Sequence, residues 1–273
     1  MNDAAQDEIE LEMDLRDALA GDEFFLLYQP TFALHDMSTT GMETLIRWRH
    51  PRRGTIQPGE FIPLLEKSGL VRQVGRWVLG EACRQTARWH CAGYVVSVAV
   101  NVSARQLDAD DFVEEVRRSL SESGLDPRAL TLEITETTLM SNAAATARRL
   151  EAIKDLGVRI AIDDFGTGYS SLAHLQRFPV DALKIDGSFV SNLDGNPDGE
   201  ALIHTLVQLG KALSIETVAE CIERHEQLSL LRREGCDSGQ GYLFARPMEV
   251  EAATYFLRTQ LQRPVLSYAA QRA

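Results

Sequence analysis

The segment VRIAIDDFG (residues 158–166) is an apolar, β-branched run that ends in two aspartates, a phenylalanine and a glycine. Residues 158–163 are typical of a buried strand, and Asp163 and Asp164 stand where that strand ends. The same arrangement recurs along the chain, because apolar runs alternate with stretches of helical periodicity. Strands that alternate with helices predict a parallel sheet or a barrel.

Eight runs have the composition of strands, over residues 24–30, 42–48, 94–102, 130–136, 158–163, 181–186, 214–220 and 239–244. Other stretches repeat their apolar residues at the helical period, over 59–68, 71–91, 107–123, 142–156, 170–177, 199–212 and 224–234. No G-x-G-x-x-G follows the first strand. The pattern therefore favours an α/β, TIM-like (β/α)8 barrel over an open doubly wound sheet.

The chain divides into a leading segment, one barrel and a tail. Residues 7–21 predict an amphipathic helix that ends at a glycine, so residues 1–22 form a leading helix or linker. No repeat or Pro/Gly/Ser-rich linker divides residues 23–262, which predict the barrel domain, and 263–273 predict a C-terminal tail. The sequence has no apolar run of membrane-span length and no signal peptide, so we expect a cytoplasmic protein.

The charge and cysteine content narrow the classes of partner. A formal net charge of −12 argues against a nucleic-acid polymer, because surfaces that bind phosphate backbones collect Lys and Arg. An anionic ligand would then be received locally, as carboxylates with divalent cations would do. The four cysteines have no C-x-x-C spacing, which fits free thiols in a reducing compartment.

Acidic or amide side chains recur within or at the ends of the predicted strands, although a carboxylate in an apolar strand needs a counter-ion. These residues are Glu43, Asn101, Glu133, Asp163, Asp164 and Glu220. Barrel enzymes build their sites at the carboxyl ends of strands, where Asn101, the aspartate pair and Glu220 lie. Glu43 opens its strand, so it joins the others only if residues 42–48 run opposite to their neighbours.

Oxygen ligands without histidine or cysteine select Mg²⁺ or Mn²⁺ rather than zinc. Two adjacent aspartates can flank a pair of ions about 3.5 to 4 Å apart, as in phosphodiester hydrolysis. Lys184, in the interior of its predicted strand, would be buried unpaired unless it faces these carboxylates, where it would orient or polarise the attacking water. The sequence lacks the Gly-rich loop and H-R-D segment of kinases and the G-x-x-x-x-G-K-[ST] of P-loop proteins.

Three more charged residues lie near the candidate ligands. Arg47 shares a strand face with Glu43 and so points into the barrel, and a structural ion pair between the two is the alternative. Glu136 and Glu223 each follow an acidic candidate by three residues. Spacing alone leaves open whether they are surface groups or functional ones.

Nine blocks of sequence, in order between residues 28 and 247, are together specific for one family, and the resemblance covers about residues 9–255. The blocks are YQP (28–30), ETLIRWRHP (43–51), FIPLLEKSGL (61–70), NVSARQL (101–107), LEITE (132–136), DDFGTGYSSL (163–172), LKID (183–186), ETVAECIE (216–223) and GCDSGQGYLFARP (235–247). They resemble the EAL family of cyclic di-GMP phosphodiesterases. The resemblance implies a TIM-like barrel with one antiparallel strand, and hydrolysis of cyclic di-GMP to linear pGpG by a two-metal mechanism with Mg²⁺ or Mn²⁺.

The resemblance also implies a role for each matching residue. The implied metal ligands are Glu43, Asn101, Glu133, Asp163, Asp164 and Glu220, with Asp163 shared between the two ions. The implied catalytic residues are Glu220 as a candidate general base, Lys184 as the holder of the attacking water, Asp163 and Asp164. The implied substrate-binding residues are Gln29, Arg47, Asp186 and Gln240. Glu136 and Glu223 resemble the residues that position the loop 163–172, through which the family couples catalysis to dimerisation, so a homodimer is expected.

Two residues depart from the family pattern. Thr44 replaces the alanine of the signature triplet, and Cys221 replaces the glycine that usually follows Glu220. We expect Thr44 to point away from Glu43, and Cys221 to restrict the backbone beside Glu220. Because no implied metal ligand is missing, an active hydrolase is favoured over a catalytically weak cyclic di-GMP receptor and over an interaction scaffold. An upstream sensor or cyclase domain is a further possible partner.

Overall fold

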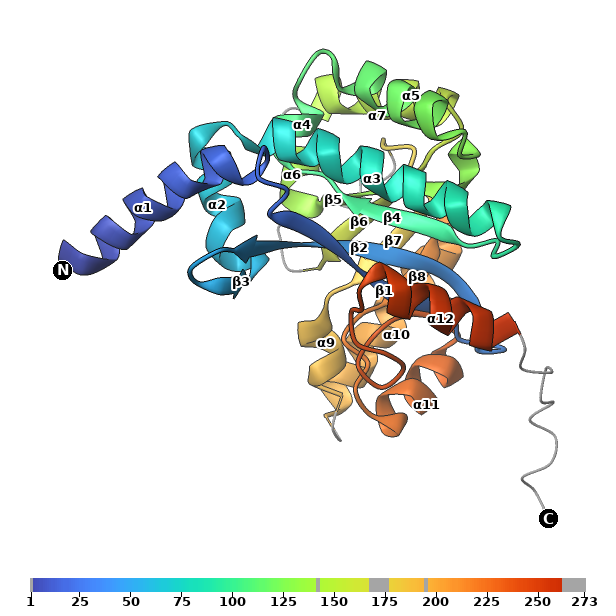
Figure 1. Cartoon of the computed structure of the whole chain (residues 1–273). Coiled ribbons are helices and arrows are strands. Elements are labelled where there is room, and N and C mark those ends of the chain that lie inside the picture. The colour runs from blue at the N-terminus through green and yellow to red at the C-terminus, as the bar shows by residue number, and fades with distance from the viewer. Residues whose placement is uncertain (1, 141–142, 167–176, 194–195, 262–273) are drawn as a thin grey trace.

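The computed structural model describes residues 2–140, 143–166, 177–193 and 196–261, whose strands form a closed barrel flanked by helices (Figure 1). The strands are β1 (Phe24–Ala33), β2 (Thr39–His50), β3 (Gly54–Ile56), β4 (Ser97–Asn101), β5 (Leu130–Thr135), β6 (Arg159–Phe165), β7 (Ala182–Ile185), β8 (Glu216–Ala219) and β9 (Ser238–Gly239). The α-helices are α1 (Asn2–Ala18), α2 (Pro58–Ser68), α3 (Val71–Cys91), α4 (Ala104–Leu107), α5 (Phe112–Ser123), α6 (Glu136–Met140), α7 (Ala143–Asp155), α9 (Gly187–Ser191), α10 (Pro197–Leu213), α11 (His225–Glu234) and α12 (Val250–Leu261). A short 3₁₀ helix covers Pro127–Ala129.

The barrel strands follow one another in the order β1-β9-β8-β7-β6-β5-β4-β2, and pairing between β1 and β2 closes the ring. β3 is a short extension that pairs with the outer end of β2. Neighbouring barrel strands are parallel, except that β1 is antiparallel to both β2 and β9. The expected TIM-like barrel with one antiparallel strand is therefore confirmed.

The antiparallel strand is β1, so the expectation that the strand of Glu43 is the reversed one is wrong. β2 runs parallel to β4, and Glu43 faces Ala99 across this pair. β2 begins at Thr39 and has twelve residues, which places Glu43 inside the strand rather than at its start. A parallel strand brings Glu43 to the site because β2 starts earlier than its sequence pattern indicated.

Other boundaries also differ from the sequence predictions. The expected helix 107–123 is two elements, α4 and α5, and the expected strand 239–244 is only the two-residue β9. After β9 the chain turns tightly, since a Cβ on Gly241 would lie 2.1 Å from the carbonyl oxygen of Ile222. The helix expected over 170–177 lies, apart from its last residue, outside the described residues, as does the tail.

The main hydrophobic core fills the layer between the barrel and the helices. Tyr28 of β1 packs edge-on against Trp89 of α3, with ring centroids 4.9 Å apart. The indole nitrogen of Trp89 donates a hydrogen bond of 2.8 Å to the hydroxyl of Thr254 in α12. This bond ties the last helix, which the sequence pattern did not predict, to α3, and through the Trp89 ring to Tyr28 of the first barrel strand.

The leading helix α1 extends away from the barrel at its N-terminal end (Figure 1). Its last turns are anchored, because Leu15 and Ala18 are buried. Further out, Ile9 and Met13 are 55% and 65% exposed. Among the described residues, no helix has both the length and the apolar character needed to cross a bilayer.

Candidate metal centre and active site

The candidate ligands on β2, β4, β5 and β6 follow a regular offset around the barrel. On each next strand, the ligand lies two residues further along the chain than the residue that pairs with the ligand before it. Glu43 pairs with Ala99 of β4. Asn101, two residues further along β4, pairs with Glu133 of β5. Because side chains two residues apart share a strand face, each step keeps the next polar side chain inside the barrel. Glu133 in turn pairs with Ala161 of β6, and Asp163 lies two residues beyond Ala161.

The same two-residue offset links the polar residues that follow β8 and β9 to Lys184 of β7. Lys184 pairs with Val218, and Glu220 follows two residues later, directly after β8. Gln240 comes directly after β9, two residues past Ser238, which is the partner of Val218. The candidates therefore converge at the carboxyl ends of the parallel strands, where barrel enzymes carry their sites.

Lys184 lies at the centre of this convergence, and its side chain is only 3% exposed. Its Nζ is 2.8 Å from a carboxylate oxygen of Glu133 and 2.8 Å from one of Glu220. Asp163 follows at 3.1 Å and Glu43 at 3.6 Å. The expectation that Lys184 faces the carboxylates is met, and their negative charge exceeds what one lysine can balance.

Two amide side chains hold Glu43. Asn101 donates from its side-chain nitrogen to one oxygen of Glu43 at 2.8 Å, and Gln240 donates to the other oxygen. Gln240 also donates to Glu220 at 3.2 Å and accepts from the hydroxyl of Thr31 at 3.2 Å. Asn101 thus uses its nitrogen on Glu43, which leaves its amide oxygen as the atom that can coordinate a cation.

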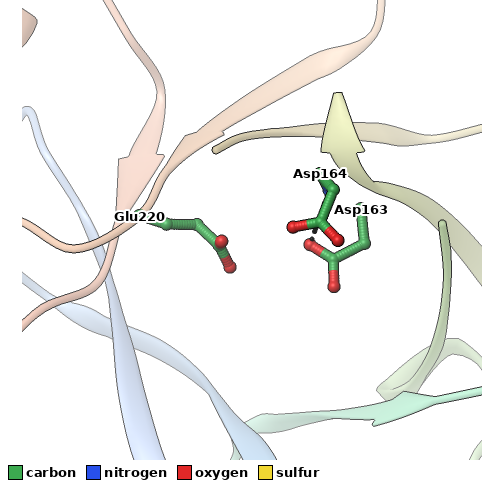
Figure 2. Close-up of side chains that lie close together, drawn as sticks. All are labelled: Asp163, Asp164 and Glu220. Atoms are coloured by element: carbon green, nitrogen blue, oxygen red, sulfur yellow. Dashed lines mark hydrogen bonds between the residues drawn. The ribbon is translucent and has the colours of Figure 1, made fainter. Parts of the chain in front are cut away.

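Asp163, Asp164 and Glu220 point toward a common space at the mouth of the barrel (Figure 2). One carboxylate oxygen from each lies within 4.8 Å of the others. Adjacent residues of a regular strand face opposite sides, but the pairing of β6 with β7 is irregular between Ile162 and Phe165. Asp164 adopts a left-handed conformation with φ of +54°, which aspartate tolerates better than most residues. This local turn brings both aspartates to the same mouth.

Burial, and then the crowding of negative charge, raise the pKa values of three of the carboxylates. Burial raises the pKa of Glu133 well above its usual value, and the neighbouring Glu43 and Asp163 raise it further. Burial also raises the pKa of Glu220 to about 7, against the opposing effect of Lys184. The pKa of Asp164 is raised by burial and by the adjacent Asp163. Glu133 and Glu220 therefore hold protons more readily than ordinary carboxylates, and a divalent cation can take the place of such protons.

Glu43 and Lys184 show the opposite behaviour. Burial would raise the pKa of Glu43, but Lys184, Gln240 and Asn101 outweigh burial and lower it. Burial alone would lower the pKa of Lys184, but the surrounding carboxylates raise it well above its usual value. Lys184 is therefore a permanent cation inside the barrel, and its charge is shared among the carboxylates around it.

The other substrate-binding candidates lie at the edges of this centre. The half-buried Arg47 makes no ion pair with Glu43 within the described part of the chain, and its guanidinium donates to the carbonyl of Ile46 at 2.8 Å. Burial lowers the pKa of Arg47. Gln29 donates to the carbonyl of Ala245 at 3.1 Å. Asp186 caps α9 by accepting the backbone N–H of Ser188 at 3.0 Å.

The two loop-positioning candidates differ in their contacts. Glu136 is 3% exposed, and its carboxylate accepts the backbone N–H of Gly166 at 3.0 Å, directly after β6. Glu223 is exposed, and its backbone N–H donates to the side chain of Gln227 at 2.9 Å. The contact of Glu136 reaches the start of the loop 163–172, of which residues 167–172 lie outside the described chain.

Both departures from the family pattern have a structural consequence. Thr44 points away from Glu43 as expected, and its hydroxyl donates to the carbonyl of Ala99 at 2.8 Å. Cys221 has a φ of +54°, a conformation that favours glycine. A Cβ placed on Gly187 would lie 2.6 Å from the Cys221 sulfur, so this thiol packs closely against the start of α9.

One pair at the mouth was not singled out from the sequence. The guanidinium of Arg246 lies 4.3 Å from the ring centroid of Tyr242, whose residue is 49% exposed. Tyr242 is close enough to Arg47 to act on its charge. Both residues belong to the block 235–247, from which only Gln240 was chosen. An exposed aromatic next to a chosen polar residue was the available signal.

The barrel and its acidic mouth define the class of the protein, a TIM-like barrel with an oxygen-donor centre at the carboxyl ends of its strands. Comparison with known families identifies the family. The family model for the EAL domain matches residues 12–247, and the chain belongs to this family.

Similar proteins come from Pseudomonas aeruginosa. The bifunctional diguanylate cyclase/cyclic di-GMP phosphodiesterase MucR is 45% identical over 252 residues, which cover 92% of this chain and 37% of MucR. The cyclic di-GMP phosphodiesterase NbdA is 43% identical over 255 residues, which cover 93% of this chain and 33% of NbdA. The chain thus spans about a third of the length of these curated relatives.

A solved structure of the PaMucR phosphodiesterase in complex with c-di-GMP superposes with a TM-score of 0.87 at 44% identity. The match covers 89% of this chain and 99% of that one.

Proposed function

We propose that this domain hydrolyses cyclic di-GMP to linear pGpG with two divalent cations, Mg²⁺ or Mn²⁺. The observation that carries the proposal is the set of five carboxylates that converge around one buried lysine at the barrel mouth, namely Glu43, Glu133, Asp163, Asp164 and Glu220. The likeness to a solved phosphodiesterase structure in complex with c-di-GMP supports the choice of substrate. The match covers 99% of the chain in that structure.

The donor set fits hard cations, because its atoms are carboxylate and amide oxygens. We propose Glu43, Asn101, Glu133 and Asp163 as ligands of one ion, and Asp164 with Glu220 at the second, with Asp163 shared. The bound cations would stabilise negative charge on the attacked phosphodiester and make water a stronger nucleophile. The raised pKa values of Glu133 and Glu220 support this assignment, because a cation can replace the protons that these groups hold.

The chain's own residues would then orient the reactants. We propose that Lys184 donates a hydrogen bond to the attacking water and that Glu220, 2.8 Å from the Lys184 ammonium, accepts the proton of that water. With a cation bound in place of its proton, Glu220 would be ionised at neutral pH and able to accept a proton from water. We propose that Arg47, Gln29, Asp186 and Gln240 contact the nucleotide, with the half-buried guanidinium of Arg47 as the phosphate-binding cation.

The direct test incubates the pure protein with cyclic di-GMP and Mg²⁺ or Mn²⁺ and separates the products. We expect pGpG from the unchanged protein, a loss of about a hundredfold or more for Asp163→Asn, and normal rates for the exposed control Asp110→Asn. Full activity of Asp163→Asn would remove its proposed metal role. Tight binding without turnover by the unchanged protein would favour the receptor function instead.

We propose that Glu136 and Glu223 position the loop that begins at Asp163, and that two copies of the domain associate. The contact between Glu136 and Gly166 supports the first part, because it fixes the backbone three residues after Asp163. Glu136→Gln should keep most of the stability and lower kcat more than it raises KM.

Sedimentation of the pure domain tests the proposed association of two copies, and a strictly monomeric active enzyme would contradict it. An upstream domain is proposed because the chain spans about a third of its curated relatives.

A further inference from the structure

The interior of the barrel is hollow beneath the carboxylate centre. A TIM barrel normally fills its interior with layers of bulky branched side chains. Here the inward positions below the centre include Gly41, Ala99, Ala161 and Ala182, which are small. Ala161 and Ala182 pack with Val218 on one side of the interior. The space that remains has a volume of about 350 Å³ and is lined by Ala99, Ala161 and Ala182 among others.

The walls of this hollow, which we call the inner hollow, are polar at both ends. Its upper end is formed by Lys184, Glu133 and Gln240, which are the floor of the candidate active site. Thr31 and Thr131 line its sides. Hydroxyl and charged groups can hydrogen-bond to water, and this volume has room for on the order of ten water molecules at about 30 Å³ each. The inner hollow therefore offers hydrogen-bonding partners for water at both ends, with apolar side chains such as Met42 and Val218 between them.

An ion pair lies at the lower end of the inner hollow. Arg159, the first residue of β6, lies 2.6 Å from Glu216, the first residue of β8. Ser238 donates to the other oxygen of Glu216 at 2.7 Å. The side chains of Arg159 and Glu216 are 37% and 31% exposed, so water reaches the pair from outside. An ion pair this exposed is weak, because water competes with it and screens it, so it does not seal the lower end of the hollow.

A second, larger hollow lies beyond this ion pair. It has a volume of about 940 Å³ and is lined by Lys211, Arg232 and Cys236, at the opposite end of the barrel from the carboxylates. The two hollows share Thr40 and Glu216. A route bounded by polar side chains thus leads from the outer surface, past Glu216, to the floor of the candidate active site.

We propose that this route is a rear water passage, through which water reaches the underside of the carboxylate centre while the nucleotide covers the front mouth. That the nucleotide covers the front mouth rests on the proposed function. Each hydrolytic turnover consumes one water molecule, and a dinucleotide held at the carboxyl-terminal mouth blocks the direct path from solvent. Water held between Lys184 and Glu216 then replaces the water that is consumed.

Whether water fills the inner hollow can be tested without an activity assay. A high-resolution crystal structure of the cation-loaded protein should contain a file of ordered waters between the Lys184 ammonium and the Glu216 carboxylate. A dry interior would overturn the proposal. The melting temperature gives a second readout, because Ala99→Leu fills space that a dry hollow leaves empty and would then raise stability. We expect Ala99→Leu to leave stability unchanged or lower, since it displaces hydrogen-bonded water.

The passage itself is tested by comparing two substrates. For cyclic di-GMP, Ala99→Leu should lower kcat about tenfold at unchanged KM, while hydrolysis of bis(p-nitrophenyl) phosphate, too small to cover the mouth, stays the same. The surface control Ala212→Leu should change neither rate. Equal loss with both substrates, or no loss with either, would overturn the passage. If Ala99→Leu fails to fold, the isosteric Thr131→Val takes its place and should show the same selectivity with a smaller effect.

The two proposals fail in different ways. If the unchanged protein cleaves neither substrate, the proposed function fails, and the ordered waters still decide whether the interior is a water passage. If the unchanged protein cleaves both substrates and the interior is dry, only the passage fails.

Discussion

At the scale of single residues, Lys184 is the cation around which the acidic mouth is organised. It is buried against four carboxylates, two of them at 2.8 Å. Removing one partner of a buried ion pair leaves uncompensated charge and destabilises a protein by about 3–5 kcal/mol. Lys184→Met should therefore lower the urea midpoint strongly and abolish hydrolysis.

A matched control is Lys154→Met, which removes a lysine paired with Asp181 at 2.6 Å but 30% exposed. This control should lower stability by less than about 1 kcal/mol. Added Mn²⁺ should restore part of the stability that Lys184→Met loses, because a cation takes over the role of the ammonium. Equal effects of the two substitutions would contradict the central position of Lys184.

The raised pKa of Glu220 predicts how stability depends on pH in the cation-free protein. The pKa rises from the ordinary 4.5 to about 7 in the folded state, so the folded protein binds the proton more tightly than the unfolded one. This contribution to stability is fully present below about pH 4.5 and is lost as the pH rises through about 7. Thermal melts with chelator should show this loss, and Glu220→Gln should flatten it.

The same proton competes with the metal. Below about pH 7, cation affinity should fall about tenfold for each unit of pH if one proton is displaced. Titration calorimetry with Mn²⁺ at several pH values measures this slope. A cation affinity that is independent of pH between 5 and 7 would show that Glu220 does not contact the ion.

Cys221 offers a test of backbone strain beside Glu220. Its left-handed φ of +54° costs a non-glycine residue on the order of 1 kcal/mol. Cys221→Gly should therefore maintain or raise the free energy of unfolding, despite the lost contact with Gly187. The exposed Cys91, the last residue of α3, gives the control, because Cys91→Gly removes helix propensity and should destabilise by up to about 1 kcal/mol.

At the scale of secondary-structure elements, periodicity predicted the helices that pack on the barrel better than it predicted the strands. The bounds of α3 are those predicted, because an apolar face repeats through its whole length. β9 has only two residues, since Gly241 turns against Ile222, and no local pattern encodes that close approach. The predicted direction of β2 was wrong for a similar reason. The direction of a strand depends on its pairing with its neighbour, here β4, and not on its own residues.

The candidate ligands could be found from sequence because acidic residues are conspicuous in apolar strands. Their convergence could not, since it depends on the two-residue register steps between neighbouring strands. The left-handed turn at Asp164, which brings both aspartates to one mouth, was also hidden from the sequence pattern. What the resemblance added was the selection of Gln240, which the structure places against Glu43 and Glu220.

The last helix provides the element-scale prediction. α12 lies beyond the part of the chain matched by the family model, yet it covers β1 and bonds to Trp89 through Thr254. Leu257 on this helix is 3% exposed, so Leu257→Ala should lower the free energy of unfolding by about 2–5 kcal/mol. Leu202→Ala in α10 removes the same atoms from a residue that is 38% exposed and should have a much smaller effect. Urea denaturation distinguishes the two.

At the scale of the whole molecule, the barrel brings together residues from across the chain to create one concentrated negative charge. Strand pairing carries the site around the ring from Glu43 to Gln240, a separation of 197 positions between two side chains that share a hydrogen bond. The formal net charge of −12 adds a long-range attraction for cations that salt screens. The closed ring of strands is what makes so many carboxylates tolerable at one mouth.

The most direct measurement of the account is a crystal structure of the protein grown with Mn²⁺, with anomalous scattering used to locate the metal. We predict two manganese peaks at the barrel mouth, one bounded by Glu43, Glu133 and Asp163 and the other by Asp164 and Glu220, both absent in Asp163→Asn. Manganese that scatters only at surface carboxylates, with Lys184 alone filling the mouth, would contradict the account.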